Sequence, residues 1–362
     1  MSNTSLNLLF QTISKYGSPA NPSSLAFEKL REMKSTFSNS DNAIIRVNPC
    51  SFMKTINSQV IFDSNEYGAV FSSNISSISS LFMVSHCQFM NIFSDNPSLV
   101  YQNSLGTFLV DSTLFYSCIS TGHVGGIQIE SSLKSVINNC CFRRCKAPSR
   151  QAIWARYSSF FDFFMNSIYQ CSPKDSKGGH DSASIGIMSY MNYHSINTTD
   201  CHVTDSSVSL QLRQTKNTLV QFSSFYNNSD AHTSFEGSVA IWDVSNFTMR
   251  FNNLIGLVYS SYCVSIDALS NITMHDCVFQ KNSRTKHIYN LGILQIFSCY
   301  FDVSTIIAGI NSLQNFFETQ QPEISLVHLN TFYCIGKKQA ITFVNPLLKP
   351  YDRITVIFFI LS

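Results

Sequence analysis

A repeated unit of about 27 residues constrains what this chain can fold into more than any other feature of its sequence. Six windows of equal length align without gaps: Gly125–Phe142, Gln151–Ile168, Gly186–Val203, Val208–Phe225, Gly237–Leu254 and Tyr262–Phe279. With the single exception of Thr198, their third, fifth, thirteenth and last residues are apolar. Self-similarity at a fixed period of this length indicates a repeat architecture, in which each unit packs on its neighbours.

The apolar positions predict two β-strands in each window, because residues two apart point to the same face of a strand. Such inward residues should stack from one unit to the next along the molecule. The residues that we expect in these internal ladders are Ile129, Ile241 and Ile266 at the fifth position and Phe142, Phe225 and Phe279 at the last position.

The last strand of the unit recurs outside the six windows, as Cys50–Phe52, Cys87–Phe89, Thr113–Phe115, Cys299–Phe301 and Asn330–Phe332. The successive intervals between Phe89 and Phe332 average about 27 residues. This length is too short for two helices with their turns, but it fits three strands and three turns. The sequence therefore predicts an all-β fold, a single right-handed parallel β-helix of the pectin-lyase type with about eleven coils.

Three regions follow from the extent of the repeat. Residues 1–43 form an N-terminal segment, in which Ser24–Phe37 has one apolar stripe and is expected to be a short helix near the cap. Residues 44–344 form the β-helix. Residues 345–362 contain the apolar run Ile354–Leu361, which is either a last strand or the first part of a truncated membrane segment. A membrane partner is expected only in the second case.

Composition narrows the function. The chain is 44% hydrophobic, has a net charge of +2 and is only 13% charged, and we find no basic cluster in it, so a nucleic-acid partner is not expected. Its 12 Cys form no CxxC motif and no zinc-ligand spacing, so neither a metal nor another cofactor is expected. The stretch from Met1 to Gly17 lacks the pattern of a signal peptide.

Two short motifs resemble a known family. Gly125–Ile129 looks like a GGAI element, and Phe225–Asn228 and Phe279–Asn282 match FxxN. These are the paired repeats of chlamydial polymorphic membrane proteins and of similar β-helix surface proteins of protists such as trichomonads. FxxC replaces FxxN at Phe115–Cys118 and Phe142–Cys145. The resemblance implies surface or extracellular display, and adhesion or antigenic variation through binding of glycans or host surface proteins.

Cys and Asn side chains recur at fixed places of the unit. The Cys residues that precede an inward apolar residue by two should point inward: Cys87, Cys140, Cys201, Cys277 and Cys299. Cys118, Cys145 and Cys171 share one place in successive turns, where they are either free stacked thiols or disulfide-bonded. Asn228 and Asn282 share the turn after a strand, where Asn can adopt left-handed angles and bond the adjacent turn as a ladder.

No residue pattern identifies a reaction. Trp154 and Trp242 neighbour inward residues and should face outward, where they are candidates for surface binding. Asp162, Asp200, Asp243 and other carboxylates fall at different offsets, so no acidic column is expected. Glu130 and Arg156 share one offset on adjacent turns and predict a surface ion pair.

The leading hypothesis is a non-catalytic β-helix that binds macromolecules or glycans on a lateral face. The alternatives are a polysaccharide lyase or glycoside hydrolase on the same fold, and a family member without retained activity.

Overall fold

The computed structural model describes residues 44–47, 51–53, 70–73, 81–85, 88–90, 92–94, 96–102, 105–171, 181–203, 208–230, 237–259, 262–283, 287–302, 307–308 and 313–318. Within these ranges the protein is an all-β parallel solenoid, and they contain no helix. The helix expected at Ser24–Phe37, the inward Cys87, the motif at Asn330–Phe332 and the segment 345–362 lie outside the described residues. No helix in the described ranges is long and apolar enough to cross a membrane.

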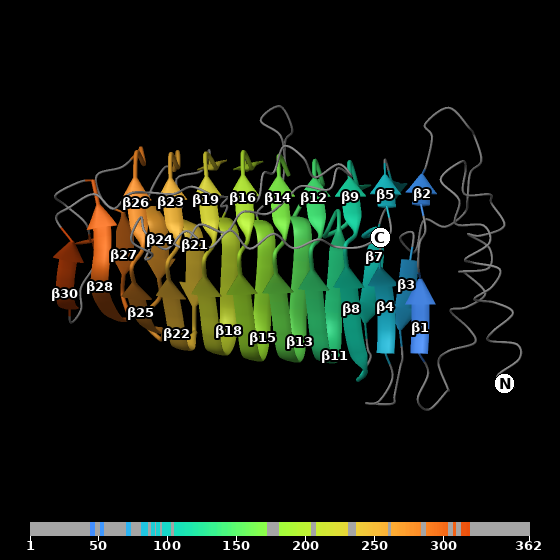
Figure 1. Cartoon of the computed structure of the whole chain (residues 1–362), viewed down its shortest axis with the longest axis horizontal. Helices are drawn as coiled ribbons and strands as arrows, with labels where there is room; N and C mark the ends of the chain where they lie inside the picture. The colour runs from blue at the N-terminus through green and yellow to red at the C-terminus, as the bar shows by residue number, and fades with distance from the viewer. Residues whose placement is uncertain are drawn as a thin grey trace, which may run out of the picture.

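Three rows of strands run along the long axis, and each strand pairs in parallel with its equivalent one turn further on (Figure 1). The opening row comprises β3 (Val70–Ser73), β7 (Leu99–Gln102), the first parts of β11 (Ile127–Asn138), β13 (Arg150–Phe164), β15 (Asp181–His194) and β18 (Val208–Gln221), then β21 (Gly237–Trp242), β24 (Tyr262–Ile266), β27 (Ile288–Asn290) and β29 (Ile307–Ala308).

The middle row comprises β1 (Ile44–Val47), β4 (Leu81–Ser85), β8 (Thr107–Asp111), the second parts of β11, β13, β15 and β18, then β22 (Ser245–Arg250), β25 (Asn271–His275), β28 (Ile293–Phe301) and β30 (Leu313–Glu318). The closing row comprises β2 (Ser51–Met53), β5 (Gln88–Met90), β9 (Leu114–Tyr116), β12 (Cys141–Arg143), β14 (Ser167–Tyr169), β16 (Asn197–Thr199), β19 (Ser224–Tyr226), β23 (Asn253–Ile255), β26 (Val278–Gln280) and the end of β28. Two short pairs lie beside the closing row: β6 (Phe93–Ser94) with β10 (Ile119–Ser120), and β17 (His202–Val203) with β20 (Ser229–Asp230).

The register of these rows agrees with five of the six aligned windows and corrects the third. In the opening row, Ala183 pairs with Ile153 of the preceding turn and with Leu210 of the next turn. The window that begins at Gly186 predicted Met188 at this position. In the closing row, Thr198 lies between Ile168 and Phe225, where the same window required Val203. The window is displaced because the alternation of apolar residues continues around the corner at Ile187 and does not distinguish the two strands.

Most corners of the coil have a residue in the left-handed backbone region, with φ between 49° and 64°. Between the opening and middle rows these residues are Ser131, Tyr157, Ile187, Gln214 and Asp243. Between the middle and closing rows they are Ser112, Asn139, Met165, Ser195, Phe222, Phe251, Asp276 and Ser298, and after the closing row Ser117, Arg144, Gln170, Asp200, Asn227, Gly256 and Lys281. Nearly all carry a side chain, which is uncommon at positive φ. The neighbouring turns therefore impose this conformation, since glycine supplies it at only one of these corners.

At several corners an Asn side chain forms hydrogen bonds with the backbone of the preceding turn. Asn228 Oδ1 accepts a hydrogen bond from Cys201 N (2.9 Å), and its Nδ2 donates to Thr198 O (2.9 Å). Asn282 makes the same two bonds, to Leu257 N (2.9 Å) and Leu254 O (3.0 Å). In both cases the left-handed residue is the one before the Asn, which corrects the expectation that the Asn itself adopts this conformation.

The same device occurs at the corner between the middle and closing rows, where we did not expect it from the sequence. Asn166 Oδ1 accepts from Cys140 N (2.7 Å), and Nδ2 donates to Ile137 O (2.8 Å). Asn252 bonds Ser223 N (2.9 Å) and Val220 O (2.8 Å) in the same way. Both side chains are buried, so these bonds satisfy backbone groups that water cannot reach.

Cys thiols replace the Asn in other turns. Cys118, Cys145, Cys171 and Cys201 are buried and aligned after the closing row, so Cys201 lies in this column and not with Cys140. Their Sγ atoms donate to the carbonyl oxygens of the preceding turn, at Phe89 (3.4 Å), Phe115 (3.6 Å), Phe142 (3.5 Å) and Ile168 (3.8 Å). This explains how FxxC can replace FxxN in the repeat. Cys141 lies outside this column and is bonded in a disulfide.

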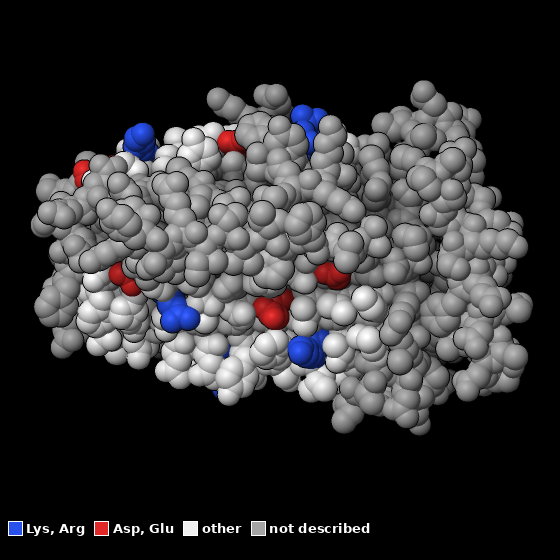
Figure 2. Space-filling view, in the orientation of Figure 1, with Lys and Arg blue, Asp and Glu red and all other residues white. Residues whose placement is uncertain are grey.

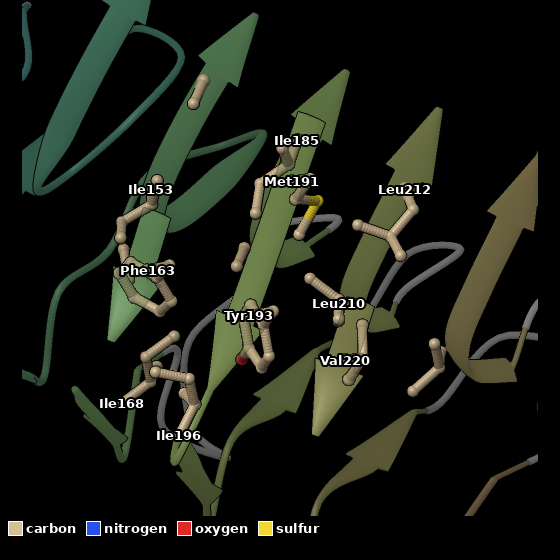
Figure 3. Packing of buried hydrophobic residues seen from close by; sticks show 14 of the residues in the cluster. Ile153, Phe163, Ile168, Ile185, Met191, Tyr193, Ile196, Leu210, Leu212 and Val220 are labelled. Atoms are coloured by element: carbon tan, nitrogen blue, oxygen red, sulfur yellow. The ribbon is translucent and has the colours of Figure 1, made fainter. Parts of the chain in front are cut away.

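Aromatic and aliphatic ladders fill the interior of the coil. Phe142 stacks on Phe115 with ring centroids 4.9 Å apart, and Phe279 stacks on Phe301 at 4.5 Å. Ile241 lies between Leu212 and Ile266 in the opening row, on the same column as Ile129. Figure 3 shows ten labelled residues of this core, from Ile153 to Val220, pointing into the interior. The hydrophobic ladder residues that the sequence predicted are all at most 1% exposed.

Candidate functional site

The first candidate site surrounds Trp154, which faces outward from β13 and is half-buried. The Arg156 guanidinium lies 4.2 Å from the centroid of the indole ring, and the Arg150 guanidinium lies 5.0 Å from it. The imidazole of His123 is 5.8 Å away, tilted by 54°. Two cations on one indole are favourable cation–π partners, and we call these four residues with Glu130 and Tyr157 the Trp154 site.

Glu130 holds the Arg156 guanidinium in place. The two residues are in register on β11 and β13, and Arg156 Nη2 and Nε lie 2.7 Å and 3.0 Å from Glu130 Oε1. The structure thus contains the ion pair that the sequence predicted. Tyr157, which is 46% exposed at the corner, places its ring 5.2 Å from the same guanidinium. One edge of the planar cation is therefore occupied by Glu130, while the Arg156 side chain remains 34% exposed.

The turn that carries the Trp154 site is rich in positive charge. The segment from residue 131 to residue 161 contains no Asp or Glu, but it contains Lys134, Arg143, Arg144, Lys146, Arg150 and Arg156. They are distributed around one turn of the coil, with Lys134 on the middle row, Arg143 on the closing row and Arg156 on the opening row, so they form a belt around the rod and not a single patch. Among the residues that Figure 2 colours, the face that it presents shows a few separate Lys, Arg, Asp and Glu residues.

Trp242, the other tryptophan that the sequence singled out, does not contribute to this site. It lies on β21, three turns after β13, and it pairs in register with Arg213 and not with the column of Trp154. The Arg213 guanidinium is 5.7 Å from its ring centroid. Trp242 is half-buried and has one cation beside it, so the two tryptophans form separate surface features.

A second surface was not apparent from the sequence. It is the outer side of the middle row from β8 to β28, and all but one of its residues are half-buried or exposed. We call it the open face. Its residues are Thr107, Leu109, Asp111, Lys134, Val136, Asn138, Phe160, Asp162, Phe164, Tyr190, Asn192, His194, Leu219, Gln221, Thr248, Arg250, Asn271, Thr273, His275, Ile293, Gln295 and Phe297, with Phe222 and Phe251 at its corner.

Aromatic rings form a continuous ridge along the open face. Phe164 and His194 lie 4.9 Å apart, His194 and Phe222 5.3 Å, and Phe222 and Phe251 5.1 Å, between ring centroids. Phe222 is 48% exposed, and Tyr190, further across the face, is 56% exposed. The rings contact one another along the axis at interplanar angles of 37°, 68° and 7°, so each ring covers part of the surface of its neighbour. The surface suits packing against another apolar surface better than stacking on a sugar ring.

Polar groups of the open face are held by their neighbours. Asn192 Nδ2 donates to Asp162 Oδ1 (3.1 Å), and Arg250 Nε donates to Gln221 Oε1 (2.7 Å). Partial burial raises the pKa of Asp162, although the Asn192 hydrogen bond, His194 and Lys134 act in the opposite direction. Partial burial also lowers the pKa of His194, against the attraction of Asp162. At neutral pH the face therefore combines neutral imidazole and aromatic rings with a few oriented charges.

Within the described ranges, no three His, Cys, Asp or Glu side chains converge as metal ligands. Comparisons of the chain with protein-family models, with curated proteins and with solved structures return no match. The Trp154 site and the open face are therefore the two features of the described residues from which a function can be inferred.

Proposed function

We propose that this protein is a non-catalytic binding scaffold of the surface-protein type, and that it binds acidic glycans at the Trp154 site. The observation that carries the proposal is the pair of guanidinium groups at 4.2 Å and 5.0 Å from one outward-facing indole. A stacked guanidinium keeps its plane fixed while its N–H groups remain at the edge, where they bind carboxylate or sulfate oxygens in pairs.

The charge around the site supports an acidic ligand. Arg150 and Arg156 both contact the indole, and Glu130 forms an ion pair of 2.7 Å with only one of them, Arg156. A uronic acid or sulfated sugar would gain from this local excess, since partly buried charges are screened less by salt than exposed ones. A neutral glycan would gain nothing from it. The preference for acidic sugars follows from this difference.

The handedness, type and length of the coil are also proposed. We infer that the coil is right-handed, of the pectin-lyase type, and has about eleven turns in the whole chain, because parallel crossovers are right-handed and the closing motif recurs from Phe52 to Phe332. Surface or extracellular display belongs to the proposal because the GGAI-like and FxxN motifs resemble those of β-helix surface proteins. The thiols of the Cys118 column and of Cys140 are buried, so oxidants in the solvent would not reach them readily.

The alternative function is a polysaccharide lyase or hydrolase that uses the same site. One observation favours it: Glu130, Arg156 and His123 gather beside an aromatic side chain, as acid–base groups do around a bound sugar. Calcium-dependent formation of unsaturated sugar ends, lost in Glu130→Gln or Arg156→Ala, would establish lyase activity. Binding without cleavage distinguishes the scaffold from the enzyme.

We expect the full chain to bind oligogalacturonate or heparin-derived oligosaccharides, measured by isothermal titration calorimetry, with an affinity that falls as salt rises. Trp154→Ala and Arg156→Lys should each weaken binding by about tenfold or more, since a charge-assisted hydrogen bond contributes about 1.5–3 kcal/mol. A Lys at this position keeps the positive charge of Arg156 but lacks the planar guanidinium group with its paired N–H donors. Its effect therefore separates specific recognition from attraction by net charge.

Trp242→Ala is the matched control, because Trp242 also contacts one Arg on the outer side of the opening row. This variant should bind with wild-type affinity. Equal losses in Trp154→Ala and Trp242→Ala, or no binding of any acidic oligosaccharide by the folded wild type, would overturn the proposed site.

A further inference from the structure

We propose that the open face is a self-association surface, on which two copies of this chain pack side by side with their long axes antiparallel. The inference goes beyond the proposed function and does not depend on it, because the Trp154 site lies on the outer side of the opening row and the open face on that of the middle row. The first observation is that the residues of the open face are mostly half-buried or exposed. Parallel sheets in folded proteins are usually covered on both sides, whereas the described strands of this one pack against one another on the inner side and leave most residues of the open face half-buried or exposed.

The composition of the open face matches the centre of a protein interface. Such centres are rich in Phe, Tyr and Arg and poor in Lys, Glu and Asp. Of the residues that define the face, two are Asp, one is Lys and one is Arg, and these charges sum to zero. Two copies can therefore approach each other without a net electrostatic cost. The exposed rings of Phe222 and Tyr190 supply the apolar contact.

The size of the face is sufficient for a dimer. Eight strands, from β8 to β28, spaced by about 4.8 Å, extend for about 34 Å, and five residues of each strand span about 16 Å. A surface of these dimensions has an area of about 550 Å², so a pair of copies would bury about 1,100 Å². This value exceeds the roughly 1,000 Å² that a specific interface requires.

The spacing of the face favours a second copy over an unrelated protein. Side chains recur along the axis once per turn, in register, over all eight strands. An unrelated globular surface would match this periodic series over a few contacts only. Another copy has the same strand spacing and matches it along the full length, as two sheets do when they pack face to face.

Charge complementarity selects the arrangement. A twofold axis parallel to the strands, midway between β15 and β18, superposes the face on itself as an isologous contact. It places β13 of one copy opposite β22 of the other, so that Asp162 faces the strand of Arg250. It also places Tyr190 and His194 of β15 opposite β18 of the partner copy, beside Phe222. A twofold axis along the rod would instead set Asp162 against its own equivalent.

The test is the mass in solution of the full chain, measured by sedimentation equilibrium over a range of concentrations. We expect a dimer for the wild type, and at least a tenfold weaker dimer for each of Asp162→Arg and Arg250→Asp. The double variant should restore the dimer, because the exchanged charges then lie on facing strands, two residues apart along the strand direction. Within one copy the two residues are three turns apart, so the restoration cannot arise inside a monomer.

Tyr226→Arg is the control, because Tyr226 is 43% exposed but lies on the closing row. It should leave the dimer intact. Thermal unfolding shows whether each single variant folds. If one of them does not, the dimer affinity of the other single variant is compared with that of the double variant. A wild type that stays monomeric at all concentrations would contradict the proposal, as would a double variant that remains monomeric. A monomer that binds glycans through Phe222 would assign the face to a glycan instead.

Discussion

Ile241→Asp is expected to prevent folding of the protein. Ile241 is fully buried between Leu212 and Ile266 in the inward column of the opening row. A carboxylate there would have neither water nor a cation beside it among these apolar neighbours. Burial of an unpaired charge costs more than about 4 kcal/mol, a large share of the stability of a folded domain.

Soluble yield and circular dichroism of the expressed chain measure this effect. Trp242→Ser is the paired control, since it changes the next residue of the same strand, which faces outward. The control should remain soluble and retain the β-sheet spectrum. A folded Ile241→Asp protein would show that this strand does not point Ile241 into the core.

Asn166→Leu is expected to be the next most damaging change. Asn166 is fully buried and bonds both Cys140 N and Ile137 O of the preceding turn. The Leu side chain can neither donate nor accept a hydrogen bond, so two buried backbone groups would lose their partners. Each such group costs about 1–3 kcal/mol, and we expect the midpoint of thermal unfolding to fall by several degrees or more.

Asn166→Cys separates the loss of hydrogen bonds from the change of shape. Cys140, Cys277 and Cys299 occupy the same column in other turns, and Cys277 N donates to Cys299 Sγ (3.4 Å). A thiol can therefore accept the backbone hydrogen bond that the Asn accepts. The Cys variant should be more stable than the Leu variant. Equal destabilisation by the two would mean that the hydrogen bonds of Asn166 contribute little.

The inward columns could be predicted because the core imposes the same requirement on every turn. Ile129, Ile241, Ile266 and the Phe residues of the closing row all meet it, and their spacing in the sequence reveals the period. The prediction failed only at the third window. There Thr198 occupies the core position of the closing row and bonds the Tyr193 hydroxyl at 3.4 Å, so the apolar marker of the register is missing.

The outer features were harder to predict, because solvent imposes no periodic requirement. His194 differs in type from Phe164, with which it is in register, and Phe222 lies one residue beyond that register, so only the stacking of turns brings the three rings together. The Trp154 site was predicted in part. The Glu130–Arg156 pair followed from shared offsets, whereas Arg150 approaches the indole through an irregular register at the start of β13.

The corner residues could not be predicted from residue type. Ile187, Tyr157 and Phe222 adopt positive φ, although β-branched and bulky side chains disfavour it. Their conformation is set by hydrogen bonds to adjacent turns, which a single repeat does not contain.

The central claim is that successive turns stack in parallel and in register, and spin-label distances test it most directly. Labels at Leu109 and Leu219 are four turns apart in one outward column, and labels at Leu109 and Thr273 are six turns apart. In the Arg250→Asp background, which avoids contacts between copies, the parallel solenoid predicts separations of about 19 Å and about 29 Å, an increase of about 4.8 Å per turn. Equal separations for the two pairs, or a shorter one for the second, would contradict the stacked coil.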